Sequence, residues 1–193
     1  MRFPATVEPT IAMSDCERFH VITGGPGSGK TTVLAELERQ GFRCAPEVAR
    51  QIIQEQMRNR GSALPWKDRE RFTQLMLAWS IDSYQQHSPA ATPIFSDRGI
   101  PDSLSYAHLI GLEDKQFLQS ACNQYRYASR VFVAPPWEQI YETDNERKQD
   151  FDEAVRTWRQ ISQTYQECGY TLVELPKTAP KLRAEFILAH LKP

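Results

Sequence analysis

A glycine-rich segment near the start of the chain constrains the possible folds more than any other feature. Residues 24–31 read Gly-Gly-Pro-Gly-Ser-Gly-Lys-Thr, so the pattern Gly-x-x-x-x-Gly-Lys-[Ser/Thr] is met at every fixed position. The apolar run at residues 19–23 predicts a strand before this segment, and helical spacing at residues 30–40 predicts a helix after it, ending at Gly41. A strand, this loop and a helix in that order predict a phosphate-binding loop.

The residues of this loop explain how it would hold a polyphosphate. Its glycines allow positive φ angles and a close approach, so that successive backbone N–H groups can point at phosphate oxygens. Lys30 would reach the β and γ phosphates, and the Thr31 hydroxyl would hold Mg²⁺. We therefore predict a site for a nucleoside triphosphate, with ATP and Mg²⁺ as the expected ligands and GTP left open. The alternative is a chance glycine turn between a strand and a helix. The expected nucleotide-binding residues are Gly24, Gly25, Pro26, Gly27, Ser28, Gly29, Lys30, Thr31 and Thr32.

Apolar runs alternate with helically spaced stretches along the rest of the chain. This alternation predicts an α/β fold, in which a parallel sheet carries helices on both faces. No linker, internal repeat or low-complexity tract divides the chain, so we expect an N-terminal arm at residues 1–18 and one domain at residues 19–193. Further strands are expected at residues 42–45, 92–96, 131–134 and 170–175, and helices at residues 48–59, 65–86, 150–168 and 180–191, with two more helices starting at Pro101 and near Asp144.

Two charged residues directly follow the third expected strand. Ligands of open α/β sheets bind beyond the carboxyl ends of the strands, so Asp97 and Arg98 are candidates for the site. Asp97 could position Mg²⁺ through a water molecule, and Arg98 could neutralise charge on a transferred phosphoryl group. The alternative is that both residues cap the next helix or pair locally.

Two other charged residues could complete the machinery. Glu47 follows the second expected strand, where a carboxylate could accept the proton of an attacking hydroxyl; alternatively it lies in a first helical turn and pairs with Arg50. Arg147 lies in a charged stretch and could belong to a lid at about residues 137–153 that closes over the triphosphate. The alternative for this stretch is a solvated helix face.

Composition excludes several other classes of function. The 23 basic and 24 acidic residues nearly cancel, and no Lys/Arg run offers a general grip on nucleic acid. The four cysteines lie far apart, so neither a zinc ribbon nor a dithiol redox motif is indicated. The first residues lack a continuous apolar stretch, so we expect no secretory signal or membrane anchor and a cytoplasmic location. We expect a monomer or a small homo-oligomer. Met13 is an alternative start.

Five segments together resemble a known family. They are VITGGPGSGKTT from residue 21, PEVAR from residue 46, FSDRGIPD from residue 95, VFVAPPWEQIY from residue 131 and DNERKQDF from residue 144. This ordered set is similar to small bacterial P-loop proteins known as predicted ATPases or AAA-type domains, which are related to the ribosylnicotinamide kinase domain of the bacterial NAD regulator. The resemblance covers nearly the whole chain from about residue 19.

The resemblance implies a three-layer P-loop NTPase fold with a five-stranded parallel sheet in the order 2-3-1-4-5. It also implies a carboxylate after the second strand and a lid arginine, which would be Glu47 and Arg147 here. The step from Asp97 to Arg98 is similar to the Asp/Glu-Arg step of deoxynucleoside and thymidylate kinases. An AAA+ motor is not expected, because such motors carry an acid pair where this chain has Asp97 followed by Arg98.

These features favour a kinase-like enzyme that moves the γ-phosphoryl group of ATP to a small molecule, such as a nucleoside or nucleotide. Catalysis would consist of positioning and charge neutralisation. A regulatory or partner-binding ATPase is a second hypothesis, in which the nucleotide-bound state is the output. A polynucleotide 5'-hydroxyl kinase is a third, which the near-neutral charge disfavours.

Overall fold

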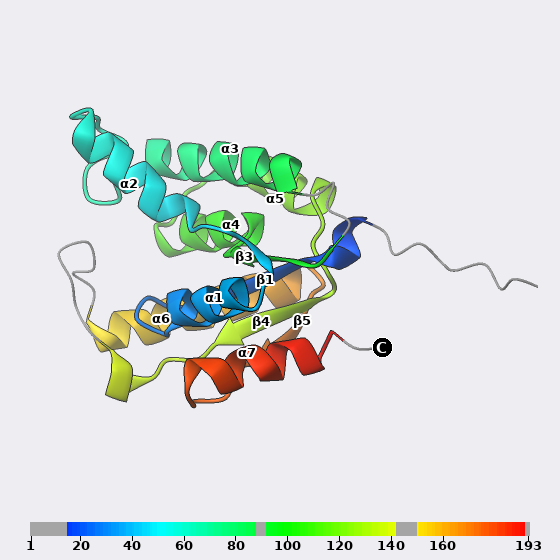
Figure 1. Cartoon of the computed structure of the whole chain (residues 1–193). Coiled ribbons are helices and arrows are strands. Elements are labelled where there is room, and N and C mark those ends of the chain that lie inside the picture. Colours follow the sequence, from blue (N-terminus) through cyan, green and yellow to red (C-terminus); the bar gives the residue numbers. More distant parts are fainter. Residues whose placement is uncertain (1–14, 88–91, 142–149, 192–193) are drawn as a thin grey trace, which may run out of the picture.

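The computed structural model describes residues 15–87, 92–141 and 150–191, and its centre is a five-stranded parallel sheet (Figure 1). The strand order is β2-β3-β1-β4-β5, as the resemblance implies. Residue Ile22 of the central strand pairs with Asp97 of β3 on one side and with Phe132 of β4 on the other. The strands are β1 (Phe19–Gly24), β2 (Arg43–Ala45), β3 (Ile94–Asp97), β4 (Arg130–Ala134) and β5 (Thr171–Glu174).

Burial follows the position of each strand in the sheet. All residues of β1 and β3 are buried, whereas the edge strands β2 and β5 are partly exposed. Side chains alternate between the two faces, so neighbouring Val21 and Ile22 belong to different core clusters. Near-continuous apolar runs are what a parallel sheet covered on both faces requires.

Helices cover both faces of the sheet and make a three-layer fold. One face packs against α1 (Lys30–Arg39) and α7 (Pro180–Ala189), which also contact each other. The other face packs against α3 (Arg69–His87), α4 (Ile100–Leu109), α5 (Gln116–Gln124) and α6 (Phe151–Glu167). Figure 1 shows α3 and α4 on the opposite side of the sheet from α7. Helix α2 (Val48–Arg58) packs on α3 through Ile52, Phe72 and Met76.

The predicted α/β class and strand order are confirmed, and most predicted elements agree with the structure to within two residues at each end. Two larger differences and one region outside the described residues remain. The helix expected from Pro65 begins instead at Arg69, because the Asp68 carboxylate accepts the Arg71 N–H and caps it there. Helix α5 was not predicted, although Leu118, Ala121 and Cys122 show helical spacing and are buried. The helix start expected near Asp144 lies outside the described residues.

The described residues give no evidence of a membrane span. Across residues 15–87, 92–141 and 150–191, no helix combines the length and the apolar character that such a span needs.

Candidate functional site: a phosphate loop beside a buried network of charges

The predicted phosphate loop connects β1 to α1 at the carboxyl end of the sheet. Gly29 has a φ of 78°, a left-handed conformation that glycine adopts without steric cost. A side chain at Gly24 could not be accommodated, because its Cβ would lie 2.4 Å from the carbonyl oxygen of Ala134. Within the loop, the Ser28 hydroxyl donates to the Gly25 carbonyl over 2.8 Å, and Thr32 donates to the Gly29 carbonyl over 2.8 Å. The glycine pattern therefore makes a compact loop that opens onto the start of a helix.

Lys30 is folded into this loop. Its side chain is only 6% exposed, and its ammonium donates to the carbonyls of Gly24 and Gly25 over 3.2 and 2.9 Å. Burial, and then the positive charge of Arg98, lower the pKa of Lys30 to about 8. The ammonium is thus mostly charged at neutral pH and lies where an added anion would raise its pKa again.

Arg98 connects the phosphate loop to two carboxylates. Its Nε donates to Glu47 over 2.8 Å, and its Nη1 donates to Asp102 and to the Gly24 carbonyl over 3.0 Å each. The backbone of Arg98 has a φ of 74°, which is uncommon for a residue with a side chain and costs about 1–3 kcal/mol. The structure therefore brings together Glu47 and Arg98, which lie 51 positions apart in the sequence.

Asp102 is a site residue that the sequence interpretation missed. It is buried and accepts from the Thr23 hydroxyl over 2.6 Å and from the Tyr165 hydroxyl over 2.7 Å, in addition to Arg98. Its other role is local, because its Oδ2 accepts the Gly99 N–H and caps α4. An acid three residues after the N-cap is a signal for this cap, whereas the contacts with β1 and α6 have no local signal.

Glu47 is held as an ionised carboxylate at the start of α2. Burial would raise its pKa, but the adjacent Arg98 and Lys30 outweigh that effect and lower the pKa of Glu47 to about 2. Its side chain remains 18% exposed and is therefore not completely enclosed by the fold. Glu47 is consequently charged throughout the physiological range and weakly basic.

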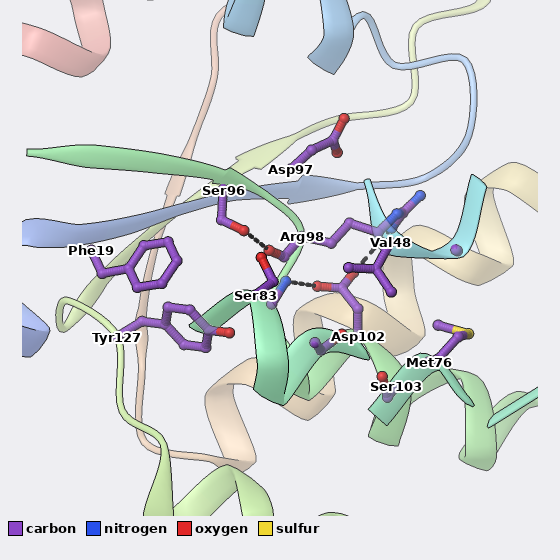
Figure 2. Close-up of a pocket in the computed structure, with 13 residues that line it drawn as sticks. Phe19, Val48, Met76, Ser83, Ser96, Asp97, Arg98, Asp102, Ser103 and Tyr127 are labelled. Atoms are coloured by element: carbon purple, nitrogen blue, oxygen red, sulfur yellow. Dashed lines mark hydrogen bonds and ion pairs between the residues drawn. The ribbon is translucent and has the colours of Figure 1, made fainter. Parts of the chain in front are cut away.

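Asp97 ends β3 in a different environment. It is 6% exposed, and its Oδ1 has no hydrogen-bond partner among the described residues. Burial raises the pKa of Asp97 to about 6, even though Lys30 and Arg98 lie near enough to oppose this. Figure 2 shows the side chains of Ser96 and Asp97 on opposite sides of β3, as strand alternation requires.

An orphaned buried carboxylate oxygen is chemically suited to a hard cation. Mg²⁺ prefers oxygen ligands and is usually held by one or two protein groups together with phosphate oxygens and water. The Thr31 side chain is exposed at the start of α1, so its hydroxyl is accessible as a second oxygen ligand. No cluster of three or more His, Cys, Asp or Glu side chains suited to a metal occurs in the described part of the chain. The donor set fits Mg²⁺ that arrives with a nucleotide and not a metal held by protein alone.

A small cavity lies beneath Arg98, between β3, α3 and α4 (Figure 2). Its volume of about 20 Å³ is enough for a single water molecule and too small for an organic acceptor. Phe19 and Tyr127 close one end, and Val48 and Met76 lie at the side of α2 and α3.

The proposed lid is described only in part. A short 3₁₀ helix, η2 (Glu138–Ile140), follows β4, and Ile140 and Tyr141 lie against the phosphate loop near Gly29 and Gly27. Arg147 lies outside the described residues.

The fold and this loop define the chain as a P-loop protein, with a 2-3-1-4-5 sheet that solved kinase structures share. A family model described as an AAA domain matches residues 19–183, so the chain belongs to that AAA domain family. A search of curated proteins returned no match.

Solved structures share the fold at low sequence identity. A NadR protein in complex with NR superposes with a TM-score of 0.68 at 17% identity, over 91% of this chain and 51% of that one, so the chain spans about half of its length. Thymidylate kinase from Ehrlichia chaffeensis has a TM-score of 0.59 at 14% identity, with 91% and 98% of the two chains covered. Shikimate kinase from Acinetobacter baumannii in complex with shikimate has a TM-score of 0.54 at 14% identity, with 92% and 94% covered.

Proposed function

We propose that this protein is a kinase that binds ATP with Mg²⁺ on residues 24–32 and transfers the γ-phosphoryl group to a hydroxyl of a small molecule. One observation carries the proposal: the Arg98 guanidinium bonds both to the Gly24 carbonyl of the phosphate loop and to the Glu47 carboxylate. A carboxylate is thereby held at the edge of the loop, where an acceptor hydroxyl would meet the terminal phosphate. Kinases among the structures of the same fold support the same reaction class.

Glu47 would orient the acceptor hydroxyl more than activate it. A pKa of about 2 makes its carboxylate a poor base for an alcohol in the ground state. Phosphoryl transfer needs little activation of the nucleophile, because its transition state is loose and the proton leaves late. An ionised carboxylate that accepts the hydroxyl hydrogen bond, and receives the proton as the new P–O bond forms, meets this requirement.

The cations of the site would divide the remaining work. Lys30 would leave the carbonyls of Gly24 and Gly25 for the β and γ phosphates, while Arg98 would stay with its carboxylates and fix Glu47. Thr31 and Asp97 would hold Mg²⁺, which neutralises charge on the phosphate oxygens when bound. Arg147 is proposed as the lid cation that approaches the transferred group.

The proposal is tested by finding an acceptor and then removing the Glu47 charge. A thermal-shift screen of nucleosides, nucleotides and phosphosugars, with an inert ATP analogue and Mg²⁺ present, should reveal a ligand that raises the melting temperature. With that acceptor, Glu47→Gln should lower kcat by about 100-fold or more and leave the Kd for ATP within a few fold. Glu113→Gln, at an exposed position between α4 and α5, is the matched control.

The outcomes separate the three functional hypotheses. Transfer of labelled phosphate to a small molecule that depends on Glu47 supports the kinase. A steady ATPase that no acceptor stimulates would refute it in favour of the regulatory ATPase, and labelling of an oligonucleotide 5' end would favour a polynucleotide kinase.

A further inference from the structure

One charged side chain beside the phosphate loop takes no part in the network described above. Arg183 lies in the first turn of α7 and is 2% exposed. Among the described residues it is the largest side chain that is fully buried. Buried guanidinium groups are normally paired with a carboxylate, because an isolated charge loses most of its hydration. The sequence gives no hint of this burial, since the residue reads as one more polar position of a terminal helix.

The contacts of Arg183 leave its charge uncompensated. Its Nη1 donates to the Ser28 carbonyl over 2.9 Å, and its Nε is buried without a hydrogen-bond partner. No carboxylate among the described residues forms an ion pair with it. Burial accordingly lowers the pKa of Arg183, although a guanidinium stays protonated in proteins.

The bond to Ser28 has a consequence for the loop. The C=O of Ser28 and the N–H of Gly29 belong to one trans peptide unit, in which the two groups point in opposite directions. A guanidinium of α7 that holds the Ser28 carbonyl on its own side therefore holds the Gly29 N–H on the opposite side of the loop. Contact is close enough that a Cβ on Gly29 would lie 2.8 Å from the Arg183 Nη1.

We propose that Arg183 is a positioning residue for the triphosphate, which fixes the Ser28–Gly29 peptide and supplies a buried positive charge that the bound polyphosphate compensates. This inference rests on the nucleotide site of the proposed function. It adds a cation from the far end of the chain to a site otherwise built from the loop and β3. The unpaired charge destabilises the free protein, and the negative charge of a bound nucleotide would remove this destabilisation.

The test compares Arg183→Met with Arg183→Lys and with Lys181→Met, an exposed cation in the same turn of α7. Two quantities are measured for each: the melting temperature of the free protein and the Kd for an inert ATP analogue with Mg²⁺ by calorimetry. Arg183→Met should leave the melting temperature unchanged or raised, because methionine fills the volume without a buried charge. The same variant should bind the analogue at least tenfold more weakly.

Arg183→Lys should retain part of the affinity, since it keeps the charge and loses the guanidinium geometry. Lys181→Met should behave like the wild type in both measurements. An unchanged Kd for Arg183→Met would overturn the assignment. A weaker Kd accompanied by a lower melting temperature of the free protein would also overturn it, because Arg183 would then be a structural residue. Wild-type protein that binds the analogue but phosphorylates nothing would refute the proposed kinase while leaving this inference standing; wild-type protein that binds no triphosphate would overturn both.

Discussion

Replacing Asp97 by asparagine should make the free protein more stable at neutral pH. Asp97 is buried, and its Oδ1 has no partner among the described residues. Burial raises the pKa of this carboxyl from 3.8 to about 6, so the fold favours the neutral acid. Asparagine is neutral at every pH and has nearly the same shape, and it therefore removes the cost of ionisation.

The size and the pH dependence follow from this shift. Each pKa unit corresponds to about 1.4 kcal/mol, so a shift of about two units gives a stabilisation of about 3 kcal/mol for Asp97→Asn at pH 7.5. For an acid whose folded pKa is raised, stability is present below the unfolded pKa and is lost as pH rises through the folded pKa. The difference between variant and wild type should therefore be about 0.5 kcal/mol at pH 4 and complete above about pH 7.

Urea unfolding of both proteins from pH 4 to pH 8 measures this difference directly. Asp82→Asn, at an exposed position of α3, serves as the control and should match the wild type at every pH. Mg²⁺ with an inert ATP analogue should stabilise the wild type more than Asp97→Asn. Equal stability of the two proteins at pH 7.5, or a gain that does not vary with pH, would refute the idea that Asp97 is held ionised at a cost for a cation.

Two other predictions concern the phosphate loop. The pKa of Lys30 in the free protein is lowered to about 8, and a bound polyphosphate raises it. Nucleotide binding near pH 8.5 should therefore take up protons, which calorimetry detects as a binding heat that depends on the ionisation heat of the buffer. The variant Lys30→Met should abolish this proton uptake. Gly29 and Gly41 have φ angles of 78° and 91°, so Gly29→Ala and Gly41→Ala should each destabilise the fold by about 1 kcal/mol or more. Only Gly29→Ala should lose nucleotide affinity, because a Cβ at Gly41 meets nothing within 4 Å. Proton uptake that persists in Lys30→Met, or full affinity in Gly29→Ala, would contradict the assigned roles.

Local patterns in the sequence were sufficient for most of the fold. The run from β1 through the loop to α1 carries its own signals, because apolar residues, glycines and helical spacing follow one another within about twenty positions. Helix α5 was missed because its nine residues form a short amphipathic stretch between irregular segments. The helix start at Arg69 depends on the Asp68 cap, which competes with Pro65 as a start signal.

The site was predictable as a set of residues but not as an arrangement. Glu47, Asp97 and Arg98 were identified because each lies at the end of a strand or just beyond it, and parallel strands end at one edge of the sheet. Their pairing was not visible, since Glu47 could equally have paired with Arg50 in its own helix. Asp102 and Arg183 escaped notice because burial and long-range contacts define their roles in the site. The local cap signal at Asp102 does not reveal those contacts.

Calorimetric titration of the wild-type protein with an inert ATP analogue and Mg²⁺ tests the central claim most directly. Binding with a Kd in the micromolar range is expected, and Lys30→Ala should weaken it at least tenfold because the ammonium contacts the β and γ phosphates. Absence of detectable heat with any common nucleoside triphosphate, or an unchanged Kd in Lys30→Ala, would contradict the assignment of residues 24–32 as a phosphate site.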